Sequence, residues 1–330
     1  MSGSPSSLRA WWARRPPVAG AAVLATGVLS VGLRLTGYEV LSRVTLALAG
    51  VGWVALGVEF VVRLVRERAR WRAEAGTPGA LTAVAATAVL GTAASALGWQ
   101  TLAAVLLALA AVLWPVLMVP VMRHWERRMP GAVFLCCVAT QSLAVLGASL
   151  AEAESVAWPA RAALVLFWLG LVLYGLMLIR FDWRQIVVGA GDQWVAGGAL
   201  AVSALAGAKL LSADTGSLYL WNDDDRGVLR TVTVALLVLD LCWYAVLLFA
   251  EVRWPRPRYD VRRWATVFPM GMTAAGLTAV ATAVDAPGLK GPGQVLLWVA
   301  AAAWLAVAAG AVAEASRVTR SSRSTSRGRR

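Results

Sequence analysis

Few side chains in this 330-residue sequence could carry chemistry, and two of them are carboxylates inside long apolar runs. Glu59 and Asp240 are each the single charge in a stretch of about 19 residues. An ionisable group inside a membrane segment is a functional candidate, because burying its charge is costly. Either carboxylate could couple transport to proton movement. Either could instead be a structural partner to a neighbouring helix, and Glu59 stands four residues before Arg63, the spacing of a helical ion pair.

The remaining reactive residues argue against an enzyme. His124 is the one histidine, which excludes a bis-histidine haem and argues against a histidine-based catalytic triad or zinc site. Cys136, Cys137 and Cys242 lie in apolar runs with no metal-binding or disulfide spacing. The acidic run 223–225 is read as a solvated loop. No phosphate-binding GxxxxGK[ST] run is present. We therefore expect no catalytic site, no metal and no cofactor.

The elements that hold these residues are transmembrane helices. The chain is 59% hydrophobic and only 15% charged, whereas soluble domains are about 25% charged. A helix needs about 20 apolar residues to cross a bilayer. Ten runs of this length are present, at 18–35, 44–62, 79–97, 103–121, 131–149, 160–178, 194–212, 231–249, 265–283 and 294–312. The sequence predicts an all-α polytopic membrane protein.

The basic residues predict its orientation and its domain organisation. If the ten runs alternate across the membrane, 24 of the 31 Lys and Arg residues fall on the side of the two termini. The positive-inside rule makes that side cytoplasmic and gives a multi-pass protein of the cell membrane. The formal net charge of +13 thus reflects topology and predicts no nucleic-acid partner. We expect a cytoplasmic N-terminus (1–17), a transmembrane domain (18–316) and a basic disordered tail (317–330).

Residue size alternates from one run to the next. Ala, Gly, Ser and Thr make up 55 of 94 residues in the odd-numbered runs and 30 of 95 in the even-numbered ones. Small residues allow helix backbones to approach closely inside a bundle, whereas bulky apolar residues suit lipid. The alternation predicts five helical hairpins, with an inner ring of odd helices around a central pore and an outer ring of even helices.

The predicted inner helices carry hydroxyls and glycines but almost no charge. Such a lining would let small anions pass without trapping them. Lys209, late in the seventh run, could raise the anion concentration at a pore mouth or extend outward to the membrane interface. The candidate lining residues are Thr26, Gly27, Ser30, Thr87, Ser95, Thr140, Ser142, Ser203, Gly271 and Thr273.

The ninth run contains a candidate gate. Pro269 removes a helical hydrogen bond and is expected to kink the helix, and Gly271 lets the kink pack closely. Phe268 is then a large ring at a bend in a helix of otherwise small residues. A ring in that place could close a narrow pore, and it could equally be a packing residue.

The segment from Trp264 to Gly271 reads W-x-x-x-F-P-M-G and resembles the ninth-helix signature of the tellurite-resistance/dicarboxylate transporter family. This family includes TehA-type bacterial proteins and the plant slow-type anion channels. The segments 25–30 and 191–203 are also similar to family regions. The resemblance implies a homotrimer with one pore in each subunit, formed by the five odd helices, and it implies that Phe268 blocks the pore.

These features together predict an anion channel or transporter with a five-helix pore and an aromatic gate, whose partners are small anions and the lipid bilayer. The alternative is a proton-linked efflux transporter for dicarboxylate, sulfite or tellurium oxyanions. An integral-membrane enzyme, or a structural or sensory membrane protein, is less consistent with the sequence.

Overall fold

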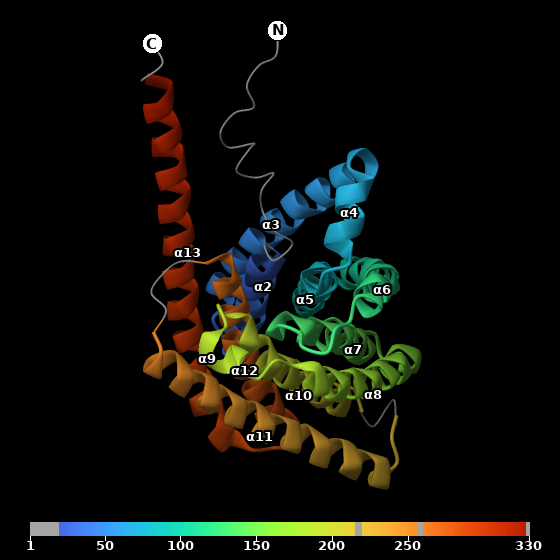
Figure 1. Ribbon diagram of the computed structural model, residues 1–330. Helices are drawn as coiled ribbons and strands as arrows, with labels where there is room; N and C mark the ends of the chain where they lie inside the picture. The colour runs from blue at the N-terminus through green and yellow to red at the C-terminus, as the bar shows by residue number, and fades with distance from the viewer. Residues whose placement is uncertain (1–19, 215–219, 256–259, 328–330) are drawn as a thin grey trace.

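A computed structural model describes residues 20–214, 220–255 and 260–327, with side chains described as far as Arg317. Within these residues, nine helices are long and apolar enough to cross a membrane, and a tenth apolar helix begins at Gly20. Short turns and helices of three to eight residues connect them in the described part of the chain. The protein is an all-α polytopic membrane protein, as the sequence predicts (Figure 1).

Ten helices pair in chain order as five hairpins, each with an inner and an outer member. The inner helices are α2 (Gly20–Leu35), α5 (Thr82–Ala96), α7 (Leu135–Glu154), α10 (Val195–Ala213) and α12 (Trp264–Ala283). The outer helices are α3 (Glu39–Arg66), α6 (Gln100–Arg123), α8 (Ala157–Arg180), α11 (Asp223–Arg253) and α13 (Lys290–Arg327). Two short helices, α4 (Arg68–Ala75) and α9 (Gln185–Val188), lie in connections where the sequence predicts none.

The inner helices form a closed ring. Each contacts the next in chain order, and α12 returns to contact α2. The spans that contain α5, α7, α10 and α12 are 83–100% buried, whereas the outer spans are only 6–33% buried. The predicted separation into a small-residue ring and a bulky outer ring is therefore confirmed for the described residues.

Small side chains allow this close packing. A Cβ atom placed on Gly271 would lie 3.1 Å from Val28 of α2, and one on Gly276 would lie 3.1 Å from the carbonyl oxygen of Ala201 on α10. A larger residue at either position would push neighbouring inner helices apart. The glycines thus hold α12 against both of its ring neighbours.

The connections from inner to outer helices share one backbone feature, a residue with a positive φ angle. In four of them a residue adopts the left-handed conformation, and these residues are Gly37, Gly98, Ser155 and Asp285. Such a residue ends a helix by turning the chain away from the helix axis. The fifth connection contains residues 215–219, which are outside the described part of the chain. The repeated turn explains how short loops return each outer helix beside its inner partner.

Two outer helices extend beyond the main bundle. The end of α3 leans away from the other helices and carries α4 (Figure 1). The last helix, α13, continues to Arg327, through most of the segment 317–330 for which the sequence predicts a disordered tail.

Candidate permeation pathway

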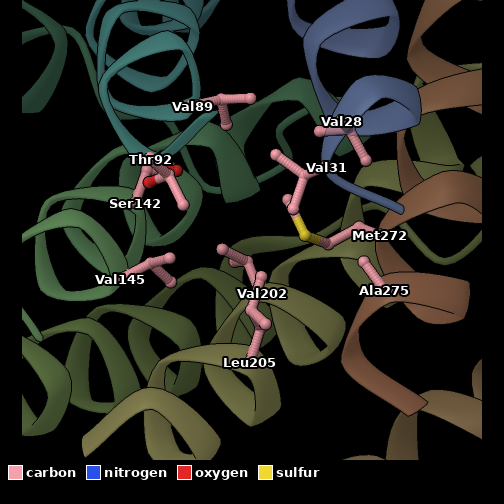
Figure 2. Close-up of a pocket in the computed structure, with 10 residues that line it drawn as sticks. All are labelled: Val28, Val31, Val89, Thr92, Ser142, Val145, Val202, Leu205, Met272 and Ala275. Carbon is pink, nitrogen blue, oxygen red and sulfur yellow. The ribbon is translucent and has the colours of Figure 1, made fainter. Parts of the chain in front are cut away.

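The axis of the inner ring is marked by a small cavity to which every inner helix contributes two residues. In each helix the two residues are three positions apart, so they occupy the same face. Figure 2 shows their side chains converging on one space from the surrounding helices. The lining consists of Val28 and Val31, Val89 and Thr92, Ser142 and Val145, Val202 and Leu205, and Met272 and Ala275.

The central cavity is narrow and carries no charge. Its total volume is about 310 Å³, of which only about 10 Å³ can hold the centre of a water molecule. That is room for roughly one water. The two hydroxyls in the lining donate to carbonyls of their own helices, Thr92 to Ala88 at 3.0 Å and Ser142 to Val138 at 2.8 Å. The pathway is therefore closed at this level.

Phe268 lies one helical turn before Met272, on the same side of α12. Its side chain is 1% exposed. Its ring tip approaches Gly198 of α10, where an added Cβ atom would lie 3.0 Å from the ring. Gly198 is itself one turn before Val202, a lining residue. The ring therefore occupies the layer next to the cavity, on the side where the inner helices begin.

Pro269 follows this ring within α12 and also packs against α10. An added Cβ atom at Gly198 would lie 2.9 Å from Cγ of Pro269. The proline leaves the carbonyl of Ala265 without its usual helical donor. Phe268 thus stands next to a break in the hydrogen-bond ladder of α12.

A wider vestibule adjoins the opposite side of the cavity, where the inner helices end. Its space, including the part open to solvent, is about 880 Å³, and it shares Val31, Thr92, Val145 and Leu205 with the cavity. Ser30, Ser95, Arg34 and Lys209 also line it. The ammonium group of Lys209 donates to Glu152 at 3.2 Å.

The vestibule keeps a net positive charge. Lys209 and Glu152 neutralise each other, and their side chains remain 25% and 38% exposed. Arg34 is the further charge in the lining. Its positive charge offsets the negative ends of the helix dipoles that converge there. An anion entering the vestibule therefore meets one formal positive charge, that of Arg34, with which no carboxylate pairs in the described part of the chain.

Three of the predicted pore hydroxyls face outward instead. Each accepts a hydrogen bond from a tryptophan indole N–H on a neighbouring outer helix, at 2.8–2.9 Å. The pairs are Thr26 with Trp304, Thr87 with Trp53, and Thr140 with Trp114. Because these threonines each lie two residues before a lining residue, they point to the other side of the helix. They join the two rings and do not line the central cavity.

The remaining predicted residues divide between the pathway and the helix contacts. Of the ten, Ser142 lines the central cavity, while Ser30 and Ser95 line the vestibule. Gly27 and Gly271 face the adjacent inner helices at Val89 and Val28. Ser203 lies 3.9 Å from the Cys137 sulfur, between α10 and α7.

Thr273 connects the inner ring to one of the two intramembrane carboxylates. It donates to Oδ1 of Asp240 on α11 at 3.2 Å. Asp240 is completely buried, and its Oδ2 has no partner among the described residues. Thr273 directly follows Met272, so this carboxylate contacts α12 behind the cavity lining.

Glu59 lies away from the ring. It forms an ion pair with Arg63 on the same helix, and Arg63 also binds Glu74 of α4 at 2.5 Å. This is the structural alternative that the four-residue spacing allows. Glu59 lines a groove on the outside of the bundle.

Most lining residues are apolar and escape a search for polar groups. What marks these residues in the sequence is their position relative to a threonine. In α2, α5 and α7 the first lining residue lies two positions after a threonine that faces outward. The sequence places Thr26, Thr87 and Thr140 in equivalent helices without revealing which face they occupy. Alignment of the five hairpins with one another places the three threonines at equivalent positions, and the lining residues then follow at a constant spacing.

Comparison with known proteins identifies the family. A search of curated proteins finds no significant match. The sequence profile of the SLAC1 family, described as voltage-dependent anion channel, matches residues 15–312 and so covers all five hairpins. Members of this family are anion channels or transporters and not enzymes. The chain belongs to the SLAC1 family of voltage-dependent anion channels.

Proposed function

We propose that the protein conducts small anions along the axis of its inner ring, with Phe268 as the gate. The observation that carries this proposal is the cavity to which all five inner helices contribute, because it lies at the centre of the ring and is bounded by uncharged side chains. Arg34 and Lys209 supply positive charge at one end of the path. No carboxylate among the cavity residues would repel an anion.

The lining also favours anions of low charge. An ion in the cavity loses most of its water and meets mainly valine, leucine and methionine side chains. The cost of removing an ion from water rises steeply with its charge, by the square in the Born description. We therefore propose that monovalent anions permeate more readily than sulfite or dicarboxylates. The test is ion flux in proteoliposomes, comparing chloride, nitrate, sulfite, malate and tellurite.

In that test, faster flux of nitrate and chloride than of malate supports the proposal. Equal flux in proteoliposomes and empty liposomes for every anion would contradict it. A cation current of similar size would also contradict it, because the vestibule carries positive charge and the described residues form none of the acidic rings that cation channels use.

A second candidate is proton-linked transport through Asp240. The carboxylate of Asp240 is buried, and only one of its two oxygens accepts a hydrogen bond among the described residues, from Thr273 of α12. A change in its protonation would therefore alter a contact with the helix that carries Phe268. This candidate predicts that flux requires a pH gradient and that Asp240→Asn removes the requirement. Glu59→Gln serves as the matched control, because Glu59 is paired with Arg63 outside the ring. Flux that is independent of pH in all three proteins favours the passive channel.

We further propose the orientation and assembly that the sequence suggests. The basic residues favour cytoplasmic termini in a cell membrane, with the vestibule on the outer side. The family resemblance favours a homotrimer in which each subunit has its own pathway.

A further inference from the structure

A large groove lies outside the inner ring, between α3 and the pair α5 and α6. The space between its walls, including the part open to the outside of the bundle, is about 1880 Å³, and α2 contributes Gly20 and Val23 to its floor. We call it the α3–α5 groove. One wall is the second half of α3, from Trp53 to Arg63, and the opposite wall includes Ala83, Ala86, Leu109 and Leu113.

The α3–α5 groove has the length and polarity of lipid hydrocarbon. The segment from Trp53 to Arg63 rises about 15 Å along α3, which is half the thickness of a bilayer core. Apart from its end at Glu59, Arg63 and Glu74, the lining is almost entirely apolar. The groove therefore spans about one leaflet, the depth that one set of acyl chains occupies.

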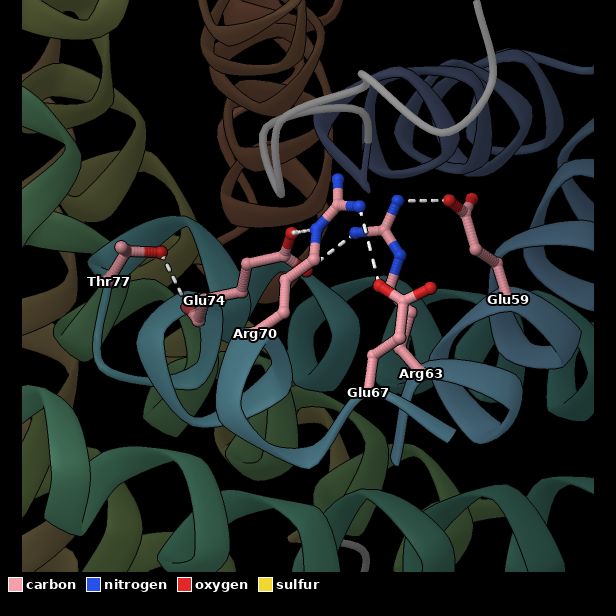
Figure 3. A network of polar contacts seen from close by, with 6 residues as sticks. All are labelled: Glu59, Arg63, Glu67, Arg70, Glu74 and Thr77. Atoms are coloured by element: carbon pink, nitrogen blue, oxygen red, sulfur yellow. Dashed lines mark hydrogen bonds and ion pairs between the residues drawn. The ribbon is translucent and has the colours of Figure 1, made fainter. Parts of the chain in front are cut away.

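The charged end of the groove is fixed by a network between α3 and α4 (Figure 3). Arg63 is bound by Glu59 and Glu74, and Arg70 reaches Glu74 at 3.0 Å and Glu67 at 3.4 Å. Arg63 is only 12% exposed. These contacts hold α4 across the end of α3. They also neutralise Arg63 and Arg70, which are then not free to bind an anion.

Three other arginines at this end keep their charge exposed. Arg66, Arg68 and Arg72 are all exposed, and in the described part of the chain none has a carboxylate within ion-pair distance. Arg68 stands one turn before Trp71, which lines the groove, and Arg72 stands one turn after Arg68. Trp71 packs edge to face on Phe60 at 5.8 Å. A tryptophan beside arginines is typical of the level of lipid headgroups.

We propose that the α3–α5 groove binds an anionic phospholipid, with its acyl chains along α3 and its phosphate beside Arg68 and Arg72. Charge complementarity favours this occupant over a second copy of the chain, because clustered arginines at the end of an apolar groove match an anionic headgroup above acyl chains. The lipid would support the second half of α3, which has few contacts with the rest of the bundle. This site is separate from the anion pathway and does not depend on the proposed function.

The test measures lipid retained by the purified full-length protein in detergent, using native mass spectrometry. The probes are phosphatidylglycerol and phosphatidylcholine with identical acyl chains. We expect the wild-type protein to retain phosphatidylglycerol preferentially. Replacing both Arg68 and Arg72 by Gln should lower that retention by at least about tenfold, since each basic residue near an anionic headgroup contributes a several-fold effect. The pair Arg184→Gln and Arg253→Gln, also exposed arginines, is the charge control.

A second variant tests the apolar part of the site. Gly57 lines the groove, and a Cβ atom there would meet no other atom within 4 Å, so Gly57→Phe fills the groove without a clash at its base. We expect it to lower retention of both lipids. Gly50→Phe is the matched control, because Gly50 lies on the same helix, is equally open and does not line the groove.

Two results would overturn the proposal. One is equal retention of the two lipids that neither the arginine variant nor Gly57→Phe changes. The other is that Gly57→Phe dissociates an oligomer while lipid retention stays constant, which would assign the groove to a second copy of the chain. Melting temperatures of all variants show whether any loss of lipid follows from unfolding.

Discussion

Thr140 and Ser142 lie two residues apart on α7 and have opposite surroundings. Thr140 accepts the indole hydrogen of Trp114, whereas Ser142 lines the central cavity. We predict that Thr140→Val leaves the indole without its acceptor and lowers the free energy of unfolding by about 1 kcal/mol, the scale of hydrogen bonds between membrane helices. Thermal unfolding in detergent measures this change, and anion flux should stay near the wild-type rate.

Ser142→Ala is the complementary prediction. It removes a polar group from the cavity lining without breaking a contact between helices, so stability should change little and anion flux should fall. A variant Ser142→Ala that conducts like the wild type, beside a Thr140→Val that abolishes conduction, would show that the two residues have been assigned to the wrong faces.

Asp260, just before α12, gives a prediction about pH. Burial raises its pKa, but hydrogen bonds from the Arg262 side chain and backbone, together with the positive charges of Arg262 and Arg263, outweigh burial, and the net pKa is lowered. A lowered pKa in the folded protein means that ionised Asp260 stabilises the fold above the ordinary aspartate pKa of about 3.9. That contribution is lost as the pH falls through the lowered pKa.

The corresponding variant is Asp260→Asn. Its stability should be lower than that of the wild type at neutral pH, and the difference should shrink on acidification below about pH 4. Chemical denaturation at a series of pH values provides the comparison. A stability difference that grows as the pH falls would contradict this sign.

At the scale of the elements, α10 and α12 meet at Gly198. The rigid ring of Pro269 and the tip of Phe268 lie within 3.0 Å of where a Cβ atom would stand. We predict that Gly198→Ala separates the two helices and lowers the melting temperature. Gly175→Ala on α8 is the matched control, since no atom lies within 4 Å there and alanine favours a helix by about 1 kcal/mol. Equal melting temperatures for the two variants would mean that α10 and α12 are less tightly packed than described.

The sequence predicts the ten helices and their two rings because both depend on composition. A long run of apolar residues predicts a membrane span, and its content of small residues predicts whether the span belongs to the inner or the outer ring. The small-residue helix α7 lies in the inner ring and the bulky helix α8 lies in the outer ring. Composition does not predict which face of each inner helix points to the ring axis. Thr140, Gln141 and Ser142 follow one another on α7 and point in directions about 100° apart, so no single polar stripe marks the face that meets the axis.

The short helix α4 also escapes prediction. Three of its eight residues are arginines, which the topology rule assigns to a cytoplasmic loop, and its ion pair to α3 joins residues that only the fold brings together. Arg63 with Glu74 is the clearest case, because eleven residues and a helix end separate them.

At the scale of the whole molecule, the outer helices leave broad apolar faces exposed, for example Val165 and Val172 on α8. Lipid and neighbouring subunits can cover such faces. We predict a homotrimer, whose protein mass by light scattering in detergent is three times the 34.8 kDa of one chain. A monodisperse mass of one chain that still conducts anions would contradict the trimer and leave the pathway of each subunit intact.

The central claim is that Phe268 closes an anion pathway along the ring axis. The most direct measurement is anion current, or flux into liposomes, through the wild type and Phe268→Ala, with Phe167→Ala on α8 as a control for the loss of a buried ring elsewhere. The account predicts that anion flux rises strongly in Phe268→Ala, stays selective against cations, and does not rise in the control. Anion flux that is absent from both proteins, or unchanged by Phe268→Ala, would contradict it.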